Sequence, residues 1–92
     1  MRIGIIGTSA IAGHFIEGAR LAGGIDIAAV YSRSLETGEA FAREWEIPIV
    51  YTSPDALAES TAVDAVYIAS PNAFHYPQSK RMLAGGKHVL CE

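Results

Sequence analysis

The sequence predicts an α/β fold in which helices cover both faces of a doubly wound parallel sheet, Rossmann-like in architecture, with strand order 3-2-1-4-5. Three observations predict it. Short runs of branched apolar residues alternate with amphipathic helical segments along the whole chain of 92 residues. These runs are apolar on both faces, which is typical of parallel strands that helices cover. Right-handed crossovers between such strands give the doubly wound arrangement.

The first strand is expected at residues 2–6, because a branched apolar run stops there at Gly7. A helix over residues 10–22 follows, with apolar side chains gathered on one side of its wheel. That inward side would hold Ile11, Ala12, Phe15, Ile16, Ala19 and Ala22. Gly23-Gly24 suits the end of this helix, and residues 25–31 form the second strand.

The second helix is expected over residues 35–45, followed by a short strand at residues 49–51. Its inward side would hold Leu35, Gly38, Phe41, Ala42 and Trp45. Residues 53–59 predict a short helix, with Ser53 as the N-cap and Pro54 at the first helical position.

The last third of the chain predicts a strand at residues 63–69, a loop, a helix and a strand at residues 87–91. Pro77 lacks an N–H and must lie in the first turn of its helix. The helix is therefore expected to begin near Phe74 and to end near Ala84.

Composition and charge exclude several classes of function. The formal net charge is -3, and the seven basic residues are scattered, so no nucleic-acid partner is expected. No apolar stretch is long enough to cross a membrane, and no leader segment is visible. The single cysteine predicts neither a disulfide nor a metal site. We therefore expect a cytoplasmic protein.

The turn after the first strand matches the G-x-G-x-x-G/A pattern at its first and last positions, with serine in the second. Its residues are Gly7, Thr8, Ser9, Ala10, Ile11 and Ala12. The glycine allows a tight turn, and the helix N-terminus offers N–H groups to a pyrophosphate. This predicts a dinucleotide site. Ser9 either donates to a phosphate oxygen or serves only as the N-cap of a plain turn.

The end of the second strand favours NADP over NAD. NAD sites usually place an acid about 20 residues after the glycine turn, but Asp26 lies at the opposite end of this strand. Ser32 and Arg33 stand there instead and can bind a 2′-phosphate. Arg33 can equally stack on adenine. A third loop, with Ser70, Pro71, Asn72 and His75, is expected at the same edge of the sheet. Asn72 can reach the cofactor, and His75 either donates to it or makes a local loop bond.

Four segments resemble the Gfo/Idh/MocA oxidoreductases: residues 4–12, 31–33, 70–75 and 86–92. The resemblance implies that Gly7, Ser9, Ile11 and Ala12 lie at the pyrophosphate and that Ser32 and Arg33 lie at the adenosine ribose. It implies that Pro71, Asn72 and His75 line the nicotinamide end. Ser9 departs from the family's usual glycine. Glu92 would begin the family's Glu-Lys-Pro motif, whose lysine helps in catalysis.

The resemblance also implies that residues 1–92 are an incomplete dinucleotide-binding domain whose substrate domain is absent. The expected parent enzyme transfers hydride between NAD(P) and a sugar, inositol or related polyol. No catalytic residue is assigned here, so the chain alone should bind cofactor without turnover. The alternatives are an NAD(P)-sensing regulatory module and, more weakly, an S-adenosylmethionine enzyme. The last strand is expected to leave an unpaired edge that favours self-association into a homo-oligomer.

Overall fold

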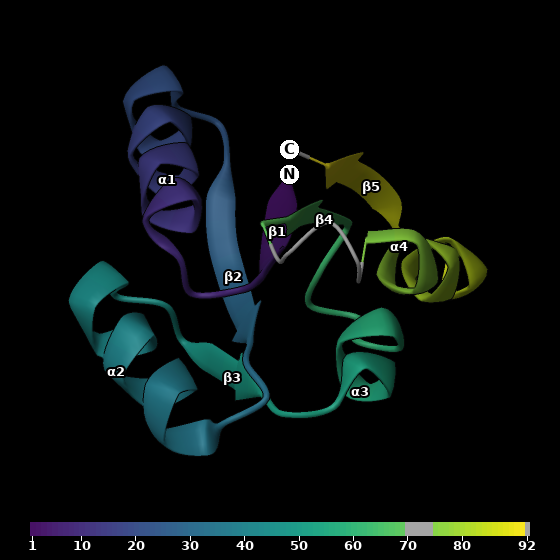
Figure 1. Cartoon of the computed structure of the whole chain (residues 1–92). Coiled ribbons are helices and arrows are strands. Elements are labelled where there is room, and N and C mark those ends of the chain that lie inside the picture. The colour runs from purple at the N-terminus through teal and green to yellow at the C-terminus, as the bar shows by residue number, and fades with distance from the viewer. Residues whose placement is uncertain (70–74, 92) are drawn as a thin grey trace.

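The computed structural model describes residues 1–69 and 75–91, with only the backbone of residues 75, 76 and 91 included. Strands and helices alternate from one end to the other, as the sequence predicts (Figure 1). The elements are β1 (Arg2–Ile6), α1 (Ala10–Ala22), β2 (Asp26–Tyr31), α2 (Leu35–Trp45), β3 (Ile49–Tyr51), α3 (Pro54–Ala58), β4 (Ala65–Ile68), α4 (His75–Ala84) and β5 (His88–Cys91). Strands β2, β4 and β5 are each slightly shorter than predicted.

The five strands form one parallel sheet of order β3-β2-β1-β4-β5, which confirms the predicted topology. Strand β1 pairs with β2 on one side and with β4 on the other. The chain therefore changes direction across the sheet between β1 and β4. In open sheets of this kind, ligands bind at the carboxyl ends of the strands beside this switch point.

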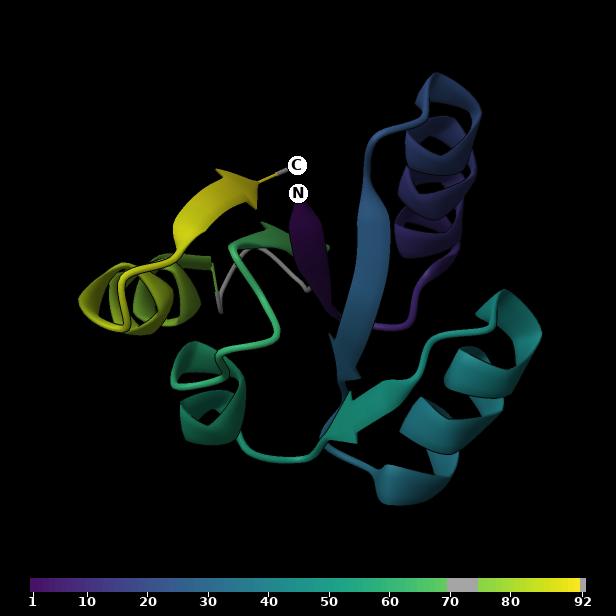
Figure 2. The ribbon, with the colours of Figure 1, turned by 180° about the vertical axis from the view of Figure 1, so that it is seen from behind.

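Two pairs of helices sandwich the sheet (Figures 1 and 2). Helices α1 and α2 cover one face, and α3 and α4 cover the other. Each face has its own apolar cluster. The first includes Ile3, Ile5, Ile16, Val30 and Phe41, and the second includes Ile6, Leu57, Val66, Ile68 and Met82. Burial on both faces explains why the strands read as continuous apolar runs.

A register shift in β2 decides which of its side chains face which helices. Ile3 pairs with Ile27, but Gly4 pairs with Ala29, so Ala28 is the extra residue of a bulge. As a result, Ile27 and Val30 both join the α1–α2 cluster, although strict alternation would send them to opposite faces.

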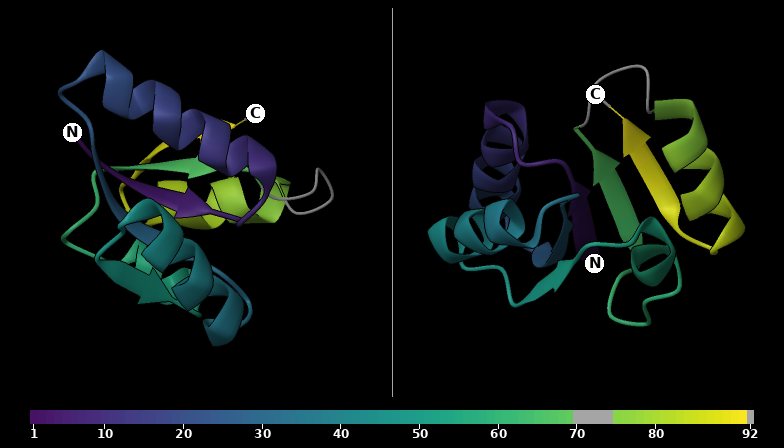
Figure 3. Two further views of the ribbon diagram at one scale, coloured as in Figure 1. Left: turned by 90° about the vertical axis from the view of Figure 1, so that its left-hand side faces the viewer. Right: turned by 60° about the horizontal axis from the view of Figure 1, so that its bottom comes forward.

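The predicted inward sides of α1 and α2 are too wide. Leu35 is 55% exposed and Ile11 is 42% exposed, and Ala22 is exposed as well. Ile11 and Leu35 lie in the first turns of their helices, and Ala22 is the last residue of α1. Helices that cross back over a sheet overhang it at their ends (Figure 3), so residues in the end turns have less sheet to pack on. Because α1 follows β1 and α2 follows β2 after short turns, both helices begin at the carboxyl edge of the sheet.

Strand β5 is the last strand on its side of the described sheet, and Leu90 on it is 47% exposed. An unpaired strand of this kind can template association. Self-association nevertheless stays a prediction. None of the helices in the described ranges has the length and apolar character to cross a membrane.

Candidate functional site

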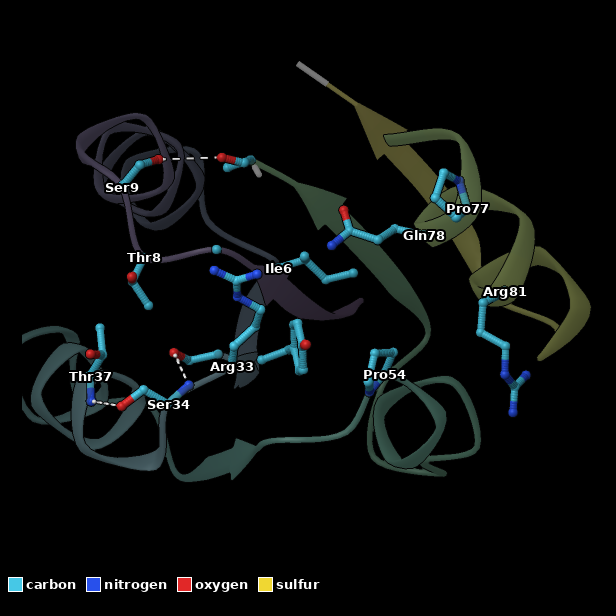
Figure 4. A pocket seen from close by; sticks show the side chains of 14 residues that line it. Ile6, Thr8, Ser9, Arg33, Ser34, Thr37, Pro54, Pro77, Gln78 and Arg81 are labelled. Carbon is cyan, nitrogen blue, oxygen red and sulfur yellow. Dashed lines mark hydrogen bonds between the residues drawn. The ribbon is translucent and has the colours of Figure 1, made fainter. Parts of the chain in front are cut away.

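A cavity of about 770 Å³ opens at the carboxyl ends of β1, β2 and β4 (Figure 4). This is the edge at which the sequence predicts a ligand. The lining residues come from β1, β2, α2, α3, α4 and the turns between them. They are Ile6, Gly7, Thr8, Ser9, Tyr31, Ser32, Arg33, Ser34, Thr37, Pro54, Ala69, Pro77, Gln78 and Arg81.

The turn from β1 to α1 forms one wall of this cavity. Gly7 has a φ of 105°, a conformation that residues with a β-carbon rarely adopt. Its N–H donates to the carbonyl oxygen of Tyr31 at 3.2 Å, which ties the turn to the end of β2. The chain can therefore reverse within three residues and begin α1 at Ala10.

Ser9 is the N-cap of α1, as one of the two predicted roles requires. Its Oγ accepts a hydrogen bond from the N–H of Ala12 at 3.4 Å. The same hydroxyl donates to the carbonyl oxygen of Ala69 at 3.4 Å, so it links the helix to the end of β4. Both contacts are long, and the hydroxyl lies on the cavity wall.

The first turn of α1 can bind an anion. The first N–H groups of a helix have no partner within it, and here Ser9 satisfies only that of Ala12. In the described part of the chain, the N–H groups of Ala10 and Ile11 have no hydrogen-bond partner. None of the cavity-lining residues that the structure describes is a carboxylate. Free N–H groups, a positive helix end and no competing acid are the features that a diphosphate requires.

The opposite wall is the loop from β2 to α2, and it is polar and basic. Ser32 is buried, and its Oγ accepts from the N–H of Ser34 at 3.3 Å. Ser34 is in turn the N-cap of α2, because its Oγ accepts from the N–H of Thr37 at 3.3 Å. Arg33 is exposed between these serines and extends into the cavity (Figure 4). No acid stands on this wall, as the sequence predicts.

The third wall comes from α3 and α4. Arg81 donates to Asp55 at 2.6 Å and to Glu59 at 2.8 Å, and these two ion pairs join the helices. The hydrogen bond to Asp55 is the largest cause that raises the pKa of Arg81 above its ordinary value. Pro54 and Pro77 complete this wall. Two carboxylates therefore already neutralise the positive charge of Arg81.

Comparison with known proteins agrees with this geometry. The profile of the Gfo/Idh/MocA oxidoreductase family, which describes an NAD-binding Rossmann fold, matches residues 1–92. The chain belongs to this family. It is 45% identical over 92 residues to the uncharacterized oxidoreductase YgjR of Escherichia coli (strain K12), and 42% identical over 92 residues to scyllo-inositol 2-dehydrogenase (NADP(+)) IolU of Bacillus subtilis (strain 168). Both matches cover 100% of the chain but only 28% of the relative.

One structurally similar solved protein contains a bound cofactor. Scyllo-inositol dehydrogenase from Lactobacillus casei, solved with NAD(H) and scyllo-inositol, is 25% identical and superposes with a TM-score of 0.86. The match covers 99% of this chain and 27% of that one. Residues 1–92 are therefore an NAD(P)-binding oxidoreductase domain, and they span just over a quarter of the length of these proteins.

The structure brings the predicted residues of the first two loops together around one cavity. Gly7, Thr8 and Ser9 line it, with Ala10 to Ala12 directly behind them in the first turn of α1. Ser32 and Arg33 line the facing wall. Ser70, Pro71, Asn72 and Glu92 lie outside the described residues. His75 begins α4, close to the predicted start, and only its backbone is described.

Several lining residues were not predicted from this Gfo/Idh/MocA sequence. Those on the helices are Thr37 on α2, Pro54 on α3, and Pro77, Gln78 and Arg81 on α4. Helical spacing could have indicated Gln78 and Arg81, because they follow His75 at successive intervals of three residues. A helix that turns His75 toward the loop therefore turns Gln78 to the same side. Across residues 1–69 and 75–91, no cluster of His, Cys, Asp and Glu is suited to a metal ion.

Proposed function

We propose that this chain holds a nicotinamide dinucleotide in the cavity at the carboxyl edge of its sheet, with NADP preferred over NAD. The observation that supports this proposal is the pair of facing cavity walls. One is a helix N-terminus whose first N–H groups have no partner among the described residues, and the other carries Arg33 and no acid. The proposed contacts are those of the sequence analysis: Gly7, Thr8, Ser9, Ala10, Ile11, Ala12, Ser32, Arg33, Ser70, Pro71, Asn72, His75 and Glu92.

The diphosphate lies against the first turn of α1 in this proposal. The amides of Ala10 and Ile11 supply donors, and Gly7 keeps a β-carbon out of the approach. The adenosine half extends toward β2 and α2. There the Arg33 guanidinium forms charge-assisted hydrogen bonds with the 2′-phosphate. The IolU relative, named as an NADP(+) enzyme, supports this choice, whereas the Lactobacillus casei enzyme was solved with NAD(H).

The whole protein, in this proposal, moves a hydride between the nicotinamide and a hydroxyl-bearing carbon of a sugar, inositol or related polyol. The two inositol dehydrogenases among the similar proteins support this substrate class. Residues 1–92 are the dinucleotide-binding domain, and the substrate is held by a separate domain. Because no carboxylate lines the described cavity, the purified chain should bind dinucleotide without turnover. A measurable rate of NADP⁺ reduction with scyllo-inositol would refute that statement.

A titration of the purified chain with NADPH and with NADH tests the proposal. Trp45 is the sole tryptophan, and it lies in a groove that Thr8, Ser9 and Ala10 also line, so its emission reports on this turn. Replacing Arg33 by Ala should raise the Kd for NADPH roughly 10- to 150-fold, because hydrogen bonds to charged groups contribute about 1.5–3 kcal/mol. The Kd for NADH should change much less.

Arg43→Ala is the matched control, because Arg43 is an exposed arginine of α2 that does not line the cavity. It removes the same charge and should leave both Kd values unchanged. Equal weakening of NADPH and NADH by Arg33→Ala would remove the 2′-phosphate role. Failure of the wild-type chain to bind either dinucleotide would overturn the proposed function as a whole.

A further inference from the structure

The α4 wall of the cavity carries an amide that the site, as described so far, does not use. Gln78 is the fourth residue of α4, is half-buried and lines the cavity. Its side chain points from the helix across the cavity toward the wall that bears Arg33 (Figure 4). A group bound between β2 and α4 would therefore meet Gln78 on one side and Arg33 on the other.

The Arg33 wall and the α3–α4 wall differ in the charge that they offer to a ligand. Arg81 is the one cation on the described part of the α3–α4 wall, and it is already paired with Asp55 and Glu59. A phosphate placed there would have to compete with two carboxylates. The same wall includes Pro54 and Pro77 and is neutral at Gln78. A flat, uncharged heteroaromatic ring suits this wall better than an anion does.

We propose that Gln78 is a specificity-determining residue that recognises the adenine base of the dinucleotide by its edge. A glutamine side chain carries one acceptor and one donor group side by side. Adenine presents the complementary pair, an N6 amino donor and an N7 acceptor, and glutamine binds this edge in a bidentate manner. The Arg33 guanidinium, on the facing wall, binds the ribose 2′-phosphate as proposed above. This inference rests on the proposed function, because it assumes that a dinucleotide occupies the cavity.

Replacing adenine by hypoxanthine distinguishes recognition by hydrogen bonds from recognition by shape alone. It has nearly the same outline as adenine, but an O6 acceptor replaces the N6 amino donor. Along the edge it then presents two acceptors, so the carbonyl of Gln78 faces an acceptor whichever way the amide rotates. A site that reads the base by a hydrogen-bonding pair rejects an analogue that lacks one partner. A site that only stacks the ring accepts both bases.

The test compares NADPH with nicotinamide hypoxanthine dinucleotide phosphate, reduced form, by titration calorimetry of the purified chain. The wild-type chain should bind NADPH roughly 5- to 150-fold more tightly, which is the discrimination expected of one bidentate contact, about 1–3 kcal/mol. Gln78→Leu should bring the ratio close to one, mainly by weakening NADPH. Gln78→Glu keeps the acceptor for the amino group and loses the donor, so its ratio should stay above one.

Lys80→Leu is the control, because Lys80 is exposed on the same helix and does not line the cavity. It should leave the ratio at the wild-type value. Thermal melts of each variant separate a change in recognition from a change in folding. Equal affinity of the wild-type chain for both analogues overturns the inference and leaves the proposed function standing. So does a Gln78→Leu variant that keeps the wild-type ratio. Absence of NADPH binding to the wild-type chain instead overturns the proposed function.

Discussion

Replacing Gly7 by Ala tests whether the turn from β1 to α1 is both strained and functional. The φ of Gly7 is 105°, well beyond the centre of the left-handed region that other residues occasionally visit. Holding a residue with a β-carbon in sparsely populated backbone space costs about 1–3 kcal/mol. A chain of 92 residues has a total stability of roughly 5–14 kcal/mol, at about 0.05–0.15 kcal/mol per residue. The variant should therefore still fold.

Each kcal/mol lowers the Tm of a domain of this size by roughly 4–8 °C, so the melting temperature should fall measurably. Urea unfolding gives the same cost independently, as a lower midpoint at unchanged slope. The alanine methyl also approaches the proposed path of the diphosphate. We expect the Kd for NADPH to rise at least about tenfold, which corresponds to 1.4 kcal/mol of lost binding free energy.

Gly86→Ala is the matched control for this prediction. Gly86 has a φ of 82°, it follows α4, and a β-carbon there would meet nothing within 4 Å. Its backbone cost should be similar, but Gly86 does not line the cavity, so the Kd for NADPH should not change. If both variants lose affinity equally, the loss reflects stability and not the turn. If Gly7→Ala melts at the wild-type temperature, the strain argument is wrong.

Two further changes test the packing and the electrostatics of the fold. Met82→Ala should lower the free energy of unfolding by about 2–5 kcal/mol in urea, because Met82 is fully buried between α4 and the sheet; a loss below 1 kcal/mol would contradict this packing. The side-chain hydrogen bonds from Arg2 lower the pKa of Asp64 to about 2. Because the folded pKa lies below the unfolded one, this pair stabilises the fold fully above about pH 4 and no longer below about pH 2. Asp64→Asn should therefore flatten the fall of Tm between pH 4 and pH 2, and an unchanged acid profile would show that the pair contributes nothing.

Local patterns in the sequence are enough to predict the order of the elements and the edge of the sheet at which the candidate site lies. Apolar runs and helical periodicity depend on neighbours a few residues apart, so β1, α1 and α2 begin and end at the predicted residues. The order 3-2-1-4-5 is the one expected of a dinucleotide-binding fold, which the alternating pattern and the glycine turn indicate. That order in turn brings the Gly7 and Arg33 loops to one edge, where both line the same cavity.

Other features depend on contacts between segments far apart in the chain, and only the tertiary structure decides them. The bulge at Ala28 comes from how β2 lies against β1, and strand periodicity does not show it. How exposed Ile11 and Leu35 are depends on where the sheet ends beneath each helix. The α4 wall with Gln78 and the pairing of Arg81 with α3 exist because two helices separated in sequence pack on the same face of the sheet. A local pattern of residues does not show how close together two segments far apart in the sequence lie in the folded chain.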